Sequence, residues 1–539
     1  MKKPSQRSPQ RSPRAIAVAA AALLTAALLP SGCLNIIDPE QDPTPPPAIL
    51  TPSPEPTEAP QPRSGGTLRI PMRPPQTLNP LLNEDATVDA VLKLLFEPMM
   101  TLDTSLKPIG NLANFTFSAD GMSVSVVLRD GLKWSDGVSV TTKDVAFSLN
   151  TLRAAPETSI YKSCAANISP QYVITDAQTI KIQFRQPFSG AAYQFCFPLI
   201  PEHYYQGNAN GTGMKPVGNG LYVFDSYTEQ REMRLNFNPD SYRKKPYIPS
   251  IEVFITPDQE TEFSAFDQRL VDVISAEAAD WGRYRNSREI NINEYVTNYY
   301  DFLGFNFNNG DLQDRLIRQA VAHAVDAEEW ITSVYLGHAE RAVSPLNPAS
   351  WLYDPNVTQY EYSLTKAGDL LKQAGFSGGS EGKTLSLRLL ANAENTERVK
   401  IANLLAESLT SLGVNAEADI QPFETYSAKI ESKDFDIFVG GLNLSVIPDL
   451  TFAFGSGNLF SYHDDVMDLL LSNAFSAVSP AGHQKAMSDL QQKIAEDLPC
   501  VSLAFRKSAV LCDQKVQGPK KPVLNNILAN INEWYIAVP

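Results

Sequence analysis

Side chains that could do chemistry are sparse in this sequence, and their spacing favours neither a catalytic nor a metal site. Asp130 and Asp136 could suggest paired catalytic carboxylates, but each precedes a glycine, as turns require. His323 stands between two alanines in a predicted helix, which favours a packed or surface position over a catalytic role. No two histidines have the spacing of metal ligands; they are His203, His323, His338, His463 and His483.

Three short motifs resemble functional signatures without completing them. Ser363–Lys366 fits the Ser-x-x-Lys pattern of penicillin-interacting enzymes, yet no Lys-Thr-Gly follows. The run 375–384 has Ser377 where a phosphate-binding loop needs its first glycine, and it precedes a strand. Tyr462–Asp465 could ligate a cation but is more typical of a helix start. The sequence therefore predicts a protein that is not an enzyme and uses no metal or cofactor.

The stretch Gly440–Phe452, GGLNLSVIPDLTF, is unusual because it is apolar and carries no charge except Asp449. Loops in water are normally polar, since water satisfies their backbone groups. We therefore predict that this loop faces a ligand or a second lobe. Asn443, Ser445 and Asp449 are its candidate ligand contacts. Alternatively, Asp449 makes a turn or caps the next segment.

Alternating strand and helix patterns precede this loop and must position it. They predict a βαβαβ unit with a parallel sheet, and ligands of such sheets bind beyond the carboxyl ends of the strands. Gly440 lies at one of these ends. The predicted strands are 384–391, 414–421 and 434–441, and the predicted helices are 396–413 and 424–432.

Turn and cap signals predict further elements. A strand-turn-strand pattern predicts a hairpin that turns at 119–121. Thr141 and Asp144 form a capping-box pattern at the start of one helix. Asp326 caps another helix, which Gly337 ends.

The first 64 residues are predicted to lie outside the fold. A basic start and the apolar run Ala15–Leu29 indicate a secretory signal peptide over 1–32. Small residues precede Cys33 as in the lipobox of bacterial lipoproteins, so we expect Cys33 to be lipidated and to anchor the chain to a membrane. The proline-rich stretch 33–64 cannot bury enough apolar surface to fold and predicts a disordered tether. The alternative is an ordinary secreted protein with a spare cysteine.

Composition excludes some classes of function. The chain has 539 residues, enough for two or three domains. It contains no internal run of 18 apolar residues, so we predict no membrane-spanning helix within the fold. Without residues 1–32 it carries 40 basic and 60 acidic residues. Because phosphate binding needs a basic face, a nucleic-acid partner is disfavoured.

Four further cysteines are expected to pair in an oxidising compartment. CVSLAFRKSAVLC suggests two strands around a turn near Arg506, which would bring Cys500 opposite Cys512. By elimination, Cys164 would pair with Cys196. The alternative is four buried thiols.

Several longer motifs resemble one family across nearly all of residues 65–539. They are GGTLRI, LNPLL, LRDGLKWSDGVSVTTKDVAFSL, PVGNGLYVFDSY, LNFNPDSYRKKPYI, YDFLGFNFNNGDLQDRLIRQAVAHAVDAEEW and AGDLLKQAGF. With these motifs the chain resembles the extracellular solute-binding proteins of family 5, the oligopeptide-, dipeptide- and nickel-binding lipoproteins of ABC importers.

The resemblance implies an α/β fold of the two-lobed, periplasmic-binding-protein-like type II, with crossover hinge strands and a ligand cleft between the lobes. Lobe one would span 66–302, with 514–539 returning to it, and lobe two would span 303–513. Tyr299, Tyr300 and Asp301 at the crossover join the candidate ligand contacts.

The resemblance also implies a lipid-anchored monomer that binds a peptide or small polar solute and delivers it to an ABC permease with its ATPase. Peptide-binding members often hold the α-amine with a GWxxD motif. Here Gly441 matches, but Leu442 and Ser445 replace the tryptophan and the aspartate, so this anchor is missing or displaced.

Two other functions stay open from the sequence. They are a surface-anchored hydrolase and a solute or pheromone receptor without transport. We expect the protein on the outer face of the cell membrane of a bacterium without an outer membrane, or in the periplasm otherwise.

Overall fold

The computed structural model describes residues 61–210, 215–376, 383–519, 522–524 and 526–537. These residues form two lobes, each with its own apolar cores, which we call lobe one and lobe two. Lobe one contains Trp134 and Trp281 in its cores, and lobe two contains Phe305 and Phe438. The α/β, two-lobed architecture predicted from the sequence is confirmed.

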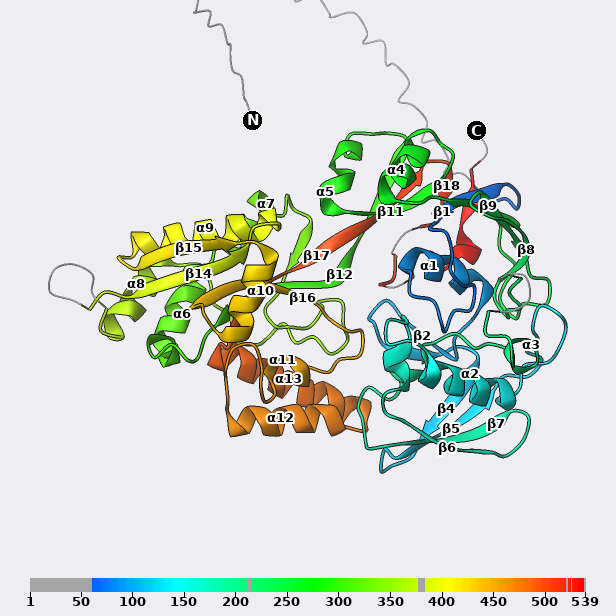
Figure 1. The fold of residues 1–539 in the computed structure, drawn as a ribbon, viewed down its shortest axis with the longest axis horizontal. Helices are drawn as coiled ribbons and strands as arrows, with labels where there is room; N and C mark the ends of the chain where they lie inside the picture. The colour runs from blue at the N-terminus through cyan, green and yellow to red at the C-terminus, as the bar shows by residue number, and fades with distance from the viewer. Residues whose placement is uncertain (1–60, 211–214, 377–382, 520–521, 525, 538–539) are drawn as a thin grey trace, which may run out of the picture. The chain divides into compact units, whose positions relative to one another are not determined.

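Each lobe mixes helices and strands (Figure 1). The elements of lobe one are β1 (Thr67–Met72), α1 (Ala86–Leu95), β2 (Met100–Leu102), β3 (Pro108–Gly110), β4 (Ala113–Phe117), β5 (Ser123–Leu128), α2 (Thr142–Ala154), β6 (Ile168–Ile174), β7 (Thr179–Phe184), α3 (Glu202–Tyr205), β8 (Tyr222–Thr228), β9 (Glu232–Phe237), β10 (Ser250–Ile255), α4 (Gln259–Asp267), β11 (Val273–Glu277), α5 (Ala278–Trp281), β18 (Val516–Gln517) and β19 (Tyr535–Ile536). The elements of lobe two are α6 (Arg315–His323), α7 (Ala327–Ser333), β13 (Ala339–Arg341), α8 (Leu364–Gln373), β14 (Ser386–Asn392), α9 (Thr396–Ser411), β15 (Asn415–Gln421), α10 (Phe423–Ser432), β16 (Ile437–Asn443), α11 (Thr451–Phe454), α12 (Asp465–Ser476) and α13 (Pro480–Asp497).

Two long antiparallel strands, β12 (Ile290–Phe305) and β17 (Cys500–Asp513), run side by side through both lobes (Figure 1). Tyr300 on β12 packs in a core of lobe two, whereas Val510 on β17 packs in a core of lobe one. These are the crossover strands that the sequence implied. The limits of the lobes at 302 and 513 stay a prediction.

The course of β17 corrects the predicted hairpin around Arg506. Cys500 is paired with Gly304 and Cys512 with Asn291, at opposite ends of one continuous strand. At about 3.3 Å per residue the two cysteines lie roughly 40 Å apart, so the predicted Cys500–Cys512 bridge is wrong. The apolar runs on both sides of Arg506 exist because each half of the strand enters a different core.

The four cysteines among the described residues are free thiols, so the predicted Cys164–Cys196 bridge is also not formed in the structure. Cys164 lies in the 3-10 turn Lys162–Ala165, and Cys196 directly follows the 3-10 turn Tyr193–Phe195. These two turns pack together, so Cys164 and Cys196 are neighbours, unlike Cys500 and Cys512.

In a non-reducing digest we expect no peptide that joins Cys500 to Cys512. Burial raises the pKa of both thiols to about 12, so both should resist alkylation in the folded protein and react after unfolding. Mass spectrometry of the alkylated digest measures this. A Cys500–Cys512 peptide would contradict the strand assignment, and a Cys164–Cys196 peptide would restore the other pairing.

The predicted βαβαβ unit is confirmed. β14 lies between β15 and β16 and is parallel to both, and α9 and α10 connect the three strands. β16 then pairs with β12 in the antiparallel sense. The unit is thereby joined to a crossover strand, and its last carboxyl end points toward the boundary between the lobes.

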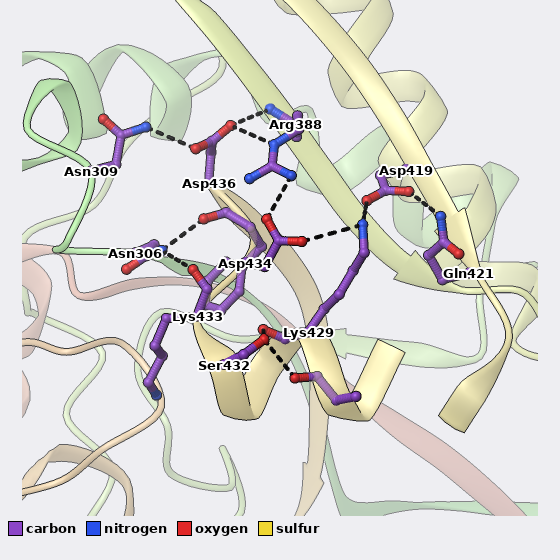
Figure 2. A network of polar contacts seen from close by, with 12 residues as sticks. Asn306, Asn309, Arg388, Asp419, Gln421, Lys429, Ser432, Lys433, Asp434 and Asp436 are labelled. Carbon is purple, nitrogen blue, oxygen red and sulfur yellow. Dashed lines mark hydrogen bonds and ion pairs between the residues drawn. The ribbon is translucent and has the colours of Figure 1, made fainter. Parts of the chain in front are cut away.

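A polar network fixes the start of β16, away from its carboxyl end (Figure 2). Arg388 on β14 bonds Asp434 at 2.8 Å, and its backbone N–H donates to Asp436 at 2.8 Å. Lys429 on α10 donates to Asp419 on β15 at 2.5 Å and lies 3.8 Å from Asp434. The charges are satisfied by one another, so we assign this cluster to holding the strands and helix together.

The predicted turn at 119–121 and the predicted helix starts are confirmed, whereas α7 ends at Ser333 and not at Gly337. Phe117 pairs with Val124 across a turn in which Gly121 has a φ of 67°. The capping box of Thr141 and Asp144 is formed at the start of α2. Asp326 caps α7, and Asp464 caps α12 within the run Tyr462–Asp465. Over the part of the chain that the structure describes, no helix is long and apolar enough to cross a membrane.

Candidate functional site

A cavity of about 1030 Å³ lies where the two lobes meet. Lobe one contributes α1 and the segment after it, and β12 contributes Tyr295, Thr297, Asn298 and Tyr299. Lobe two contributes Asn443 to Ile447, at the carboxyl end of β16. The volume is at the upper end of the range for small-molecule sites, which suits a ligand larger than a single amino acid.

The loop after β16 is held in place by polar contacts to the crossover. The backbone N–H of Leu444 donates to the carbonyl of Asn298 at 3.0 Å, and the Asn298 amide donates to the carbonyl of Leu444 at 2.9 Å. Asn347 in turn donates to the Asn298 side chain at 2.8 Å. The first two bonds satisfy the backbone N–H and carbonyl of Leu444 at the start of the apolar loop, and Ser445 and Ile447, which follow, line the cavity.

Three of the predicted ligand contacts come together at the cavity. Tyr299 on β12 is opposite Asn443 on β16, and both line the cavity. The Tyr299 side chain is 47% exposed, which leaves it available to a ligand. Ser445 follows on the loop, and its Oγ accepts the N–H of Ile447 at 3.1 Å.

The other three predicted contacts lie elsewhere. Asp449 borders a separate hollow of about 30 Å³, and its carboxylate accepts the N–H of Thr451 at 2.9 Å. Tyr300 is buried and hydrogen-bonded to Ser502 at 2.6 Å. Neither Tyr300 nor Asp301 lines the cavity. The structure therefore favours the turn or cap alternative for Asp449.

Asp301 is the centre of a buried charge cluster. Its side chain is 1% exposed and accepts hydrogen bonds from Arg506 Nε at 2.6 Å and Arg398 Nη2 at 3.0 Å. The Tyr335 hydroxyl donates to the same carboxylate at 3.1 Å. Asp301 thus joins β12 to β17 and α9, and it braces β12, which pairs with the strand β16 that leads into the cavity loop.

Acidic residues of lobe one also line the cavity, and the sequence reasoning missed them. They are Asp89, Glu97, Asp103 and Glu262. Asp89 stands among the apolar residues of α1, and Glu262 shares a face of α4 with Ala265 and Phe266. An acid within an apolar helical stripe is the signal that could have found these two residues.

Side chains outside the crossover strands also join the lobes. Trp351 Nε1 donates to the Tyr193 hydroxyl at 3.0 Å, and the Trp351 backbone N–H donates to the carbonyl of Ser105 at 2.9 Å. The rings of Phe188 and Phe475 lie 4.7 Å apart. These contacts connect the two lobes outside the crossover strands.

The described residues contain no cluster of three or more metal-ligating side chains. His323 is buried, and its Nδ1 lies 2.6 Å from the carbonyl of Glu361, so of the predicted packed or surface positions it has the packed one.

Comparisons with known proteins agree with this geometry. The family model of bacterial extracellular solute-binding proteins, family 5 Middle, matches residues 107–458. The oligopeptide-binding protein AppA of Bacillus subtilis is 25% identical over 515 residues, which cover 88% of this chain and 93% of AppA.

Solved structures share the fold. The structure of AppA from Bacillus subtilis in complex with a nonapeptide has a TM-score of 0.60 at 23% identity, covering 89% of this chain and 100% of that chain. The substrate-binding protein CtaP of Listeria monocytogenes has a TM-score of 0.73 at 21% identity, covering 88% of this chain and 100% of that chain.

Proposed function

This chain belongs to the bacterial extracellular solute-binding proteins of family 5, and we propose that it is a lipid-anchored receptor for peptides. Members of this family serve ABC importers and are not enzymes. In this proposal the protein binds a peptide outside the cytoplasm without changing it. Movement of the lobes encloses the ligand, and the loaded protein delivers it to an ABC permease whose ATPase supplies the energy.

The observation that carries this proposal is the cavity to which both lobes and the neutral loop contribute. The cavity-lining residues 443–447 carry no charge, and Asn298 bonds the backbone of Leu444 among them, which suits an uncharged peptide backbone better than an ionic solute. The relative from Bacillus subtilis carries the name of an oligopeptide-binding protein. We propose Tyr299, Asn443 and Ser445 as ligand contacts, because all three line the cavity.

The test is retention of peptides by the purified protein. A peptide library is incubated with the protein, and bound peptides are recovered after gel filtration and identified by mass spectrometry. We expect intact peptides at a ratio of about one per chain, and heat stability that rises with peptide concentration. Cleaved peptides with repeated turnover would instead support a hydrolase.

The ligand contacts are tested with matched tyrosines. Removing a central aromatic contact typically costs about 2 kcal/mol or more, so Tyr299→Ala should weaken peptide binding roughly thirtyfold. Tyr362 is similarly exposed, at 45% against 47%, and lies outside the cavity. Tyr362→Ala should leave affinity unchanged, and equal affinity of the two variants would remove Tyr299 from the site.

We also propose that Cys33, which lies outside the described residues together with the signal peptide 1–32 and most of the tether 33–64, is the lipid anchor. Cys33→Ser should release the protein from the membrane fraction or stall removal of the signal peptide. Fractionation followed by immunoblotting measures this. An unchanged membrane fraction would contradict the anchor. Alanine in place of the exposed Ser472 is the processing control.

A further inference from the structure

The carboxylate of Glu262 lines the cavity but has no partner of its own. Glu262 lies on α4 and is 7% exposed. Within the described ranges, no hydrogen bond or ion pair reaches its side chain. A buried charge without a partner is costly, and proteins rarely keep one unless something outside the free protein can pair with it.

The other carboxylates that line the cavity are satisfied. Asp89 lies 2.5 Å from the Lys93 ammonium, and Glu97 lies 3.1 Å from the Arg243 guanidinium. Asp103 accepts backbone N–H groups of the turn that follows it, at 2.8 and 3.0 Å. Glu262 therefore differs from the rest in being both buried and unpaired.

The charged groups around Glu262 do not replace a partner. Burial raises its pKa to about 7, Arg73 lowers it, and Asp85 at the start of α1 raises it further. Arg73 acts on Glu262 through its charge without an ion pair or hydrogen bond to it among the described residues, and its Nη1 donates to the carbonyl of Pro257 at 3.3 Å. A group that is close to half ionised at neutral pH can gain its full charge when a cation arrives.

We propose that Glu262 binds a positively charged group of the ligand, such as an α-amine or a lysine ammonium. This inference rests on the proposed function, in which the cavity holds a peptide. The charged group of the ligand is then bound by α4 of lobe one. It is not bound by the loop after β16, where Ser445 stands in place of an aspartate.

The first test compares two forms of one ligand mixture. An arginine- and histidine-free pentapeptide library is offered with free amines, and the same library is offered after acetylation. Wild type should retain the free-amine library at least about tenfold better, and Glu262→Gln should lose this preference. Glu260→Gln is the matched control, since Glu260 is an exposed residue on the same helix and does not line the cavity.

The outcomes separate the inference from the proposed function. If wild type retains both libraries equally, or if Glu262→Gln keeps the preference, the inference is overturned and peptide binding stands. If wild type retains neither library, peptide binding itself is refuted, and the inference falls with it.

A second test needs no ligand. The folded-state pKa of Glu262 is raised from 4.5 to about 7, so the carboxyl binds its proton more tightly in the folded protein. Wild type should therefore lose stability as the pH rises from about 4.5 through 7, and Glu262→Gln should not show this loss. The Tm of the variant should exceed that of wild type at pH 8, and by less at pH 5. A variant Tm below wild type at pH 8 would reveal a partner within the protein and overturn the inference.

Discussion

Replacing Asp301 by alanine is expected to lower the free energy of unfolding by about 3–5 kcal/mol. The carboxylate is 1% exposed and is the counter-charge of Arg398 and Arg506, whose side chains are only 19% and 26% exposed. Its loss leaves two cations largely out of water, with no carboxylate at bonding distance. Urea denaturation, followed by the shift of the midpoint at constant slope, measures the change.

The control is a pair of opposite charges in water. Lys485 and Asp489 are one helical turn apart on α13, 2.9 Å from each other, and their side chains are 77% and 47% exposed. Asp489→Ala should cost less than about 1 kcal/mol. If Asp301→Ala also costs less than this, solvent reaches the arginines and the cluster does not brace the crossover.

The second large effect is expected at Gly218. A Cβ there would lie 1.9 Å from the carbonyl oxygen and 2.8 Å from the carbonyl carbon of Leu95. Both are backbone atoms at the end of α1, which cannot turn aside as a flexible side chain can. Gly218→Ala should therefore destabilise the protein by about 3 kcal/mol, the upper part of the range for overpacking. Thermal denaturation followed by circular dichroism measures it.

The same substitution at Gly310 provides the control. No heavy atom lies within 4 Å of a Cβ built there, and its φ of −61° suits any residue. Gly310→Ala should change stability by no more than about 0.5 kcal/mol. Equal stability of the two variants would mean that the end of α1 can move away from Gly218.

Both positions matter for the cavity as well as for stability. Asn219, next to Gly218, accepts the backbone N–H of Glu97 at 2.9 Å, and Glu97 lines the cavity. Asp301 braces β12 two residues beyond Tyr299. Either variant should therefore also weaken peptide binding under the proposed function, even where the chain remains folded.

The sequence by itself determined the elements whose signals are local. The βαβαβ unit follows from alternating periodicities of apolar residues, and the helix that begins at Thr142 follows from the capping box of Thr141 and Asp144. The turns at Gly131 and Gly137 follow from glycine's freedom at positive φ. The position of the apolar loop at the carboxyl end of β16 was also predicted, because strand direction in a parallel unit is set by connectivity.

Only the tertiary structure decided which distant residues meet. The run Cys500–Asp513 has the same local pattern as a hairpin, and it forms one strand because each half enters the core of a different lobe. Asp301 directly follows Tyr300 and is two residues from Tyr299, yet its carboxylate bonds Arg398 and Arg506 and does not line the cavity. Glu262 became a candidate because the fold buries it beside the cavity without a bonded partner among the described residues. Burial and pairing depend on contacts between residues far apart in the chain, and the local spacing of residues does not reveal these contacts.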